Sequence, residues 1–213
     1  MGSGNALKRS GDVAASLIAL VVTSPLLLMC ALLIALASPG PILFHQERVG
    51  LHGRRFRIHK FRTMAVNAET TGPSITSGDD PRLTAIGRAL RRVKFDELPQ
   101  FYNVLVGEMS LVGPRPEIAH YVDRYPEPAR DDVLSVRPGI TDLASLRYID
   151  EAGLLARVPD AEQYYVDVLI PAKLELAVAY VRNRSLWLDV RIVAATLTGI
   201  LGWHWMPSHA PIR

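Results

Sequence analysis

The segment KFDELPQ, residues 94–100, places two adjacent carboxylates, Asp96 and Glu97, where a helix is expected to begin. Pro99 suits the first helical turn, because its missing N–H would have no intrahelical partner there. Apolar residues follow at helical spacing, and Gly107 suits the helix end. The positive end of a helix dipole favours ionised carboxylates. From this segment alone, a helix cap among solvated charges and a catalytic carboxylate pair remain equally open.

The composition indicates one domain with enough apolar residues for a core. The chain has 213 residues, of which 49% are hydrophobic, and a net charge of +3. That charge favours anionic partners only weakly. The single cysteine, Cys30, excludes an intramolecular disulfide framework. No zinc-binding spacing and no nucleic-acid-binding motif is present, so no nucleic-acid partner is expected.

Residues 13–37 form an apolar run long enough to cross a bilayer, with Ser24-Pro25 near its centre. Proline kinks a helix, and the Ser24 hydroxyl could bond a carbonyl that Pro25 frees. Lys8 and Arg9 precede the run, and many cations follow it between residues 48 and 62. The positive-inside rule then asks for both flanks on the cytoplasmic face. We therefore predict a re-entrant helix that is bent at Ser24-Pro25, with an ordinary kinked span as the alternative.

Residues 42–49 and 55–62 predict two strands of a basic hairpin, joined by residues 50–53. Its basic surface suits phosphate or lipid headgroups, although a solvated hairpin face fits equally well. Three histidines recur in this region at intervals of seven residues: His45, His52 and His59. This spacing is not expected to make them neighbours, so we interpret them as surface or internally satisfied side chains rather than metal ligands.

Further along, residues 67–81 predict a long loop, and residues 82–94 a helix with basic faces. Two loops then place an arginine beside proline: GPRPE holds Arg115, and RPG holds Arg137. A backbone fixed by proline presents a guanidinium rigidly, which suits bidentate phosphate binding.

Five motifs occur in a characteristic order along most of the chain, from Lys8 to about Asp189. They are Ser24-Pro25, KFRTM at residues 60–64, DELPQ at 96–100, GPRP at 113–116 and RPGIT at 137–141. As a set they closely resemble the bacterial sugar transferases known as small monotopic phosphoglycosyl transferases. Residues 142–148, DLASLRY, depart from the pattern of many relatives, so no sugar specificity is carried over.

The resemblance implies transfer of a sugar-1-phosphate from a UDP-sugar to polyprenol phosphate at the cytoplasmic face of a bacterial inner membrane. It also implies a ping-pong reaction that releases UMP, with Mg²⁺ as the metal. The reaction would be a first step in polysaccharide or glycoconjugate assembly. The resemblance further implies a re-entrant helix and the minimal catalytic form without a multi-span N-terminal region. The expected partners are the UDP-sugar, polyprenol phosphate and cytoplasmic membrane lipids, with homo-oligomerisation open.

By the same resemblance, Asp96 is the nucleophile that forms a phosphosugar–aspartate intermediate, chemistry that a carboxylate can perform. Glu97 either helps Asp96 hold Mg²⁺ or accepts a proton. The candidate phosphate-binding residues are Lys60, Arg62, Arg91, Arg115 and Arg137.

The expected fold class is α+β: mostly helical, with a small basic β-hairpin, an N-terminal re-entrant membrane helix at residues 1–38, and a catalytic domain at 39–213 lying on the membrane. Trp187, Trp203 and Trp205 favour an interfacial amphipathic helix near the C-terminus. Two alternatives remain. One is a non-enzymatic membrane protein with a basic lipid- or nucleic-acid-binding surface, and the other is a metal-dependent pyrophosphatase.

Overall fold

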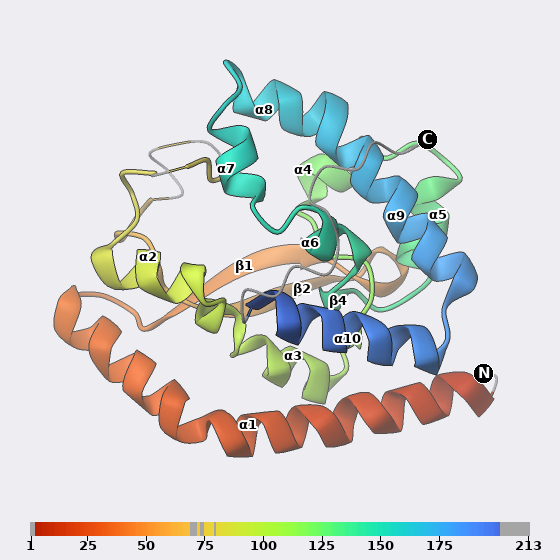
Figure 1. Ribbon diagram of the computed structural model, residues 1–213, viewed down its shortest axis with the longest axis horizontal. Coiled ribbons are helices and arrows are strands. Elements are labelled where there is room, and N and C mark those ends of the chain that lie inside the picture. Colours follow the sequence, from red (N-terminus) through yellow and green to blue (C-terminus); the bar gives the residue numbers. More distant parts are fainter. Residues whose placement is uncertain (1–2, 69–71, 73–74, 79, 201–213) are drawn as a thin grey trace.

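The structure, a computed structural model, describes residues 3–68, 72, 75–78 and 80–200. It is mostly helical with two small sheets, which confirms the expected α+β class (Figure 1). The helices are α1 Ser3–Ala37, α2 Ala85–Arg92, α3 Gln100–Val106, α4 Ala119–Val122, α5 Ala129–Leu134, α6 Leu143–Arg147, α7 Glu151–Leu155, α8 Ala161–Tyr164, α9 Ile170–Asn183 and α10 Leu186–Ile200. The strands are β1 Leu43–Val49, β2 Arg55–Phe61, β3 Ser110–Val112 and β4 Gly139–Thr141.

Helix α1 continues through Pro25 and changes direction along its length (Figure 1). Proline has no N–H, so the carbonyl of Val21 loses its helical partner. The Ser24 hydroxyl donates to that carbonyl at 2.8 Å, which confirms the partner expected for it. Among the described residues, α1 is the one helix long and apolar enough to cross a membrane by length and composition. Its re-entrant course stays a prediction.

Strands β1 and β2 pair antiparallel and confirm the hairpin. One face of β2 buries Phe56 and Ile58 against α3. Lys60 lies on the same face and forms an ion pair with Glu97. Opposite this face, His45 pairs with His59, and their ring centroids lie 4.7 Å apart. The expectation that these histidines are not neighbours was therefore wrong. A hairpin whose turn is centred near His52 brings positions equally distant from it into register.

Among the described residues, four clusters of buried apolar side chains hold the elements together. The largest joins α5, the π-helical turn Tyr165–Leu169 and α9. Another packs the second half of α1 against Phe61 and Leu90, so that α1 lies against the hairpin and α2. The other two join β2 to α3, and β3 to α9 and α10. These contacts place α1 along one side of the molecule, beside α3 (Figure 1).

The sequence did not predict the parallel pairing of β3 with β4. Gly113 and Gly139 pass each other so closely that a Cβ on Gly139 would lie 2.2 Å from the Gly113 nitrogen. Glycine is therefore required at this crossing. The Pro114 carbonyl, in the loop that carries Arg115, accepts from the Gly139 N–H at 3.0 Å, so this loop lies beside the start of β4.

Helix α10 exposes 70% of Trp187, and its interfacial placement stays a prediction. Trp203 and Trp205 lie outside the described residues. Earlier in the chain, the Asp160 carboxylate accepts from the Gln163 N–H at 2.9 Å and caps the start of α8.

Candidate active site

Asp96 and Glu97 lie in a 3₁₀ turn, Phe95–Glu97, directly before α3. The helix begins at Gln100, so Pro99 caps α3 and does not lie inside its first turn. Gly107 ends the helix with a positive φ of 92°, as predicted. Asp96 is only 6% exposed, and its Oδ1 atom has no hydrogen-bond partner in the part of the chain that the structure describes. A buried carboxylate oxygen without a partner is costly, and such a group calls for a binding partner.

Glu97, in contrast, is held on both carboxylate oxygens. Lys60 Nζ donates to Oε1 at 2.8 Å, and Arg115 Nη1 donates to Oε2 at 3.3 Å. Arg115 Nη2 also donates to Oε1, which makes the guanidinium pairing bidentate. The structure thus brings together Asp96, Glu97, Lys60 and Arg115, four of the site residues predicted from the sequence.

The two carboxyl groups have opposite pKa shifts. Burial, and then the negative charge of Glu97, raises the pKa of Asp96 above its usual value. Burial also opposes ionisation of Glu97, but the charges of Arg115 and Lys60 outweigh it and hold the pKa of Glu97 well below its usual range. Burial lowers the pKa of Lys60, while the charge of Glu97 opposes that change. The pair therefore consists of one firmly ionised carboxylate and one with a raised proton affinity.

Arg91 approaches the same site from α2. Its Nε donates to the Thr63 hydroxyl at 2.9 Å. Its positive charge partly opposes the rise in the pKa of Asp96. Helix α2 can pack this closely because Gly87 lies against Thr63, where a Cβ would meet the Thr63 carbonyl at 1.9 Å. Arg91 thus adds a further cation beside Asp96.

Arg62 and Arg137, also predicted to bind phosphate, donate elsewhere. Arg62 donates to the carbonyls of Ser38 and Pro39, both at 2.8 Å, at the end of α1. Arg137 Nε donates to the Gly107 carbonyl at 2.8 Å, at the end of α3 opposite the carboxylates. The structure does not bring these two arginines to the carboxylates.

Two further residues are linked to the site residues, one by its place in the chain and one by a hydrogen bond, and neither was singled out from the sequence. Gln100 follows Asp96 by four residues and is 1% exposed, and neither amide atom has a partner among the described residues. Its spacing from Asp96 is the signal that could have found it. The Asp142 carboxylate accepts from the backbone N–H of Arg115 at 3.1 Å and so fixes the Arg115 loop. That pairing joins distant segments and leaves no local signal.

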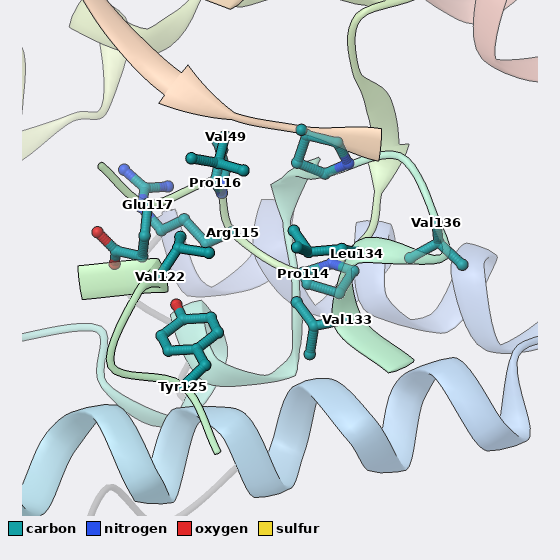
Figure 2. A pocket seen from close by; sticks show the side chains of 12 residues that line it. Val49, Pro114, Arg115, Pro116, Glu117, Val122, Tyr125, Val133, Leu134 and Val136 are labelled. Carbon is teal, nitrogen blue, oxygen red and sulfur yellow. The ribbon is translucent and has the colours of Figure 1, made fainter. Parts of the chain in front are cut away.

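A small, partly open hollow adjoins Arg115. Figure 2 shows Arg115, Glu117 and Tyr125 together with apolar side chains around it. The apolar lining includes Val49, Val122, Val133 and Val136. One face of the Arg115 segment therefore meets the carboxylates, while another lines this hollow.

Within the described ranges, no group of three or more histidine, cysteine, aspartate and glutamate side chains could hold a metal ion. Of the two carboxylates, Asp96 has the oxygen that could bind a metal ion, because both oxygens of Glu97 accept hydrogen bonds from cations. The site can thus offer one carboxylate oxygen to a cation or electrophile, with Lys60, Arg91 and Arg115 nearby to neutralise anions.

Comparison with known proteins gives consistent matches. The chain is 42% identical to UDP-N-acetylgalactosamine-undecaprenyl-phosphate N-acetylgalactosaminephosphotransferase of Aeromonas hydrophila, over 92% of this chain and 44% of that protein. It is 36% identical to UDP-glucose:undecaprenyl-phosphate glucose-1-phosphate transferase of Escherichia coli, over 90% of this chain and 39% of that protein. It is also 40% identical to exopolysaccharide production protein PSS of Rhizobium leguminosarum, over 92% and 95% of the two chains.

The chain thus spans less than half the length of the first two relatives. The family profile itself matches nearly the whole chain, and the match includes every residue of the site described above. Because the bacterial sugar transferase profile covers residues 3–202, the chain belongs to the bacterial sugar transferase family.

Proposed function

We propose that this protein transfers a sugar-1-phosphate from a UDP-sugar to undecaprenyl phosphate and releases UMP. The observation that carries the proposal is the buried, unpartnered Oδ1 of Asp96 beside a carboxylate that is already neutralised by cations. The names of the two first relatives supply the substrate class.

In the first half-reaction, an Asp96 carboxylate oxygen attacks the β-phosphorus of the UDP-sugar. A new P–O bond forms to Asp96, the bond from the β-phosphorus to the bridging oxygen breaks, and UMP leaves with the bonding electrons. Splitting one transfer into two displacements is what a carboxylate nucleophile offers. Arg91 and Lys60 lie close enough to Asp96 to influence its pKa, and so lie where they can neutralise phosphoryl charge.

In the second half-reaction, a phosphate oxygen of the lipid attacks the phosphorus of the phosphosugar–aspartate intermediate. The P–O bond to Asp96 breaks, which restores the carboxylate and yields a polyprenyl diphosphosugar. Glu97 remains ionised through this cycle, because Arg115 and Lys60 hold its pKa low. Its low proton affinity favours an electrostatic role, as the anchor of two cations, over proton transfer.

The donor set also fits Mg²⁺, with Asp96 as the protein ligand. Mg²⁺ in phosphoryl-transfer sites usually takes one or two carboxylates and completes its shell with substrate phosphates and water. When bound, it would neutralise charge on the diphosphate and on departing UMP. Glu97 fits less well than Asp96 as a ligand, because its two oxygens already accept from Arg115 and Lys60.

We further propose that the protein is monotopic in the bacterial cytoplasmic membrane, with α1 re-entrant and the catalytic domain on the cytoplasmic face. The exposed apolar side chains of α1 and the cations on both of its flanks support this placement. A membrane-bound acceptor such as undecaprenyl phosphate would then meet the site at the bilayer surface.

The test is UMP release from a panel of UDP-sugars, with the purified protein in lipid nanodiscs and undecaprenyl phosphate present or absent. The proposal expects steady turnover with lipid, and one equivalent of UMP per enzyme without it. Asp96→Asn should release no UMP in either case, whereas Asp131→Asn, at an exposed aspartate of α5, should match the parent protein. Continued release without lipid would favour a pyrophosphatase, and turnover by Asp96→Asn would remove the nucleophile assignment.

A further inference from the structure

The first turns of α1 bind the catalytic domain through polar side chains. Lys8 Nζ donates to the Asp189 carboxylate of α10 at 2.7 Å. One turn of helix later, Asp12 is only 6% exposed and accepts from the Ser110 hydroxyl of β3 at 2.7 Å. Between them, Arg9 reaches the end of α3. The end of α1 that precedes its apolar run is thus tied to three separate elements of the domain.

Arg9 binds α3 at the end opposite the carboxylates. Its Nη1 donates to the Val104 carbonyl at 2.7 Å, and its Nη2 donates to the Leu105 carbonyl at 3.0 Å. The last carbonyls of a helix have no intrahelical partners, and a cation there also complements the helix dipole. Because Arg9 grips two carbonyls with one planar fork, it fixes the orientation of α3 as well as its end.

Helix α3 is short and well fastened, so a constraint at its end reaches its beginning. Asn103, in the middle of the helix, is fully buried and donates to the Arg57 carbonyl of β2 at 2.8 Å. The turn that carries Asp96 and Glu97 leads directly into α3, through residues with helical backbone angles at Leu98 and Pro99. The placement of α3 therefore sets the placement of the carboxylates.

Asp12 acts on the other half of the site. Besides the Ser110 hydroxyl, it accepts from the Leu111 N–H at 3.4 Å, so it holds both side chain and backbone of β3. Strand β3 ends at Val112, and Gly113 and Pro114 then lead to Arg115. Through β3, Asp12 fixes the approach of the segment whose guanidinium binds Glu97.

We propose that Arg9 and Asp12 are positioning residues, through which the membrane helix holds the Asp96 turn and the Arg115 loop in register for phosphoryl transfer. The inference rests on the function proposed above and deepens it. If Arg9 served only to set the membrane topology, its positive charge would suffice, and lysine would supply that charge equally well. The positioning role requires more, because it depends on a guanidinium that donates to two carbonyls at once.

The test uses the protein in nanodiscs without lipid acceptor and follows the UMP burst after mixing with the active UDP-sugar. The burst amplitude counts competent enzyme, and its rate constant reports the chemical step in that enzyme. Arg9→Lys keeps the charge and loses the fork, so we expect an unchanged amplitude and a rate constant lowered about tenfold, since small misplacements of reacting groups cost this much or more. Arg130→Lys is the matched control, because it is the same substitution at an arginine of α5 whose carboxylate partner is Asp123, and it should behave as the parent.

Ser110→Ala probes the same arrangement from the domain side, in case Arg9→Lys does not fold. It removes the hydroxyl that donates to Asp12, and we expect a slower burst of full amplitude. A lower amplitude with an unchanged rate constant in both variants would overturn the inference, because it would show a role in folding alone. Parent-like bursts in both would also overturn it. If the parent protein releases no UMP at all, the proposed function fails, and the inference falls with it.

Discussion

The guanidinium of Arg115 binds both oxygens of the Glu97 carboxylate, and this pairing distinguishes Glu97 from its neighbour Asp96. Two adjacent carboxylates in a buried turn would otherwise compete for the same cations. Here Glu97 takes Arg115 and Lys60, while an oxygen of Asp96 is left without a partner among the described residues. Which carboxylate the guanidinium of Arg115 reaches thus decides which one is held ionised and which one keeps an oxygen without a partner, as the proposed nucleophile requires.

Arg115→Lys should lower UMP release about 10²-fold, comparable to the loss of one charge-stabilising donor in other active sites. Lysine keeps the positive charge but cannot bind both Glu97 oxygens at once. Turnover in nanodiscs measures the effect, with Arg130→Lys as control, because Arg130 is a partly exposed arginine whose carboxylate partner, Asp123, lies at 3.5 Å. Turnover of Arg115→Lys within twofold of the parent would show that charge alone suffices.

Asp96→Asn and Glu97→Gln should change stability in opposite directions. Burial raises the pKa of Asp96, so the stability that its protonated form contributes is fully present below the unfolded value of about 3.9 and is lost as pH rises through the folded pKa. The pKa of Glu97 is held low, so its effect is present above about 4.3 and is lost as pH falls through the folded pKa. Near neutral pH, Asp96→Asn should therefore raise the Tm and Glu97→Gln should lower it.

Thermal unfolding followed by circular dichroism in detergent, from acid to neutral pH and with chelator present, checks this pair. Both differences from the parent should shrink at the acid end. Shifts of the same sign near neutral pH would show that the charges of Lys60 and Arg115 are shared between the two carboxylates.

Local patterns predicted much of the fold because their partners are close in the chain. The hairpin follows from two apolar–basic strands around a glycine-containing turn, and Gly107 and Asp160 end and begin helices by their own backbone and side-chain preferences. The hairpin and the helix ends need no knowledge of the remote chain. The carboxylates and Lys60 are different: Lys60 and Glu97 lie 37 residues apart and meet because β2 packs on α3, so the family resemblance rather than a local pattern pointed to this group.

The fate of each arginine could not be predicted in this way. A guanidinium binds a backbone carbonyl as readily as a phosphate, so Arg62 and Arg137 had no local feature that separated them from Arg115. The choice depends on which oxygens the tertiary fold brings near. Strands β3 and β4 have three residues each and lie far apart in sequence, too short for a periodic signal. Their pairing decides where Arg115 and Arg137 lie.

The histidine pair of the hairpin gives a prediction about proton affinity. Burial, and then the neighbouring charge of His45, lowers the pKa of His59, while Glu108 opposes the shift. His45→Gln should therefore move the pKa of His59 upward, as measured by NMR titration of the imidazole resonances. His52→Gln, in the turn, should leave it unchanged. An equal response to both variants would mean that the effect is not the cross-strand contact.

The bend of α1 gives a prediction about topology. Pro25 withholds an N–H from the Val21 carbonyl, and Ser24 supplies a hydroxyl in its place, so the bent helix has this carbonyl satisfied even within lipid. Cysteines introduced by Asn5→Cys and Arg54→Cys, both at exposed positions, should then react with an impermeant reagent from the cytoplasmic side only. The parent chain serves as background, because its Cys30 is buried.

Pro25→Ala restores the helical hydrogen bond and favours a straight span, which would move position 5 to the opposite side. Labelling of positions 5 and 54 from opposite sides without that substitution would exclude the re-entrant course.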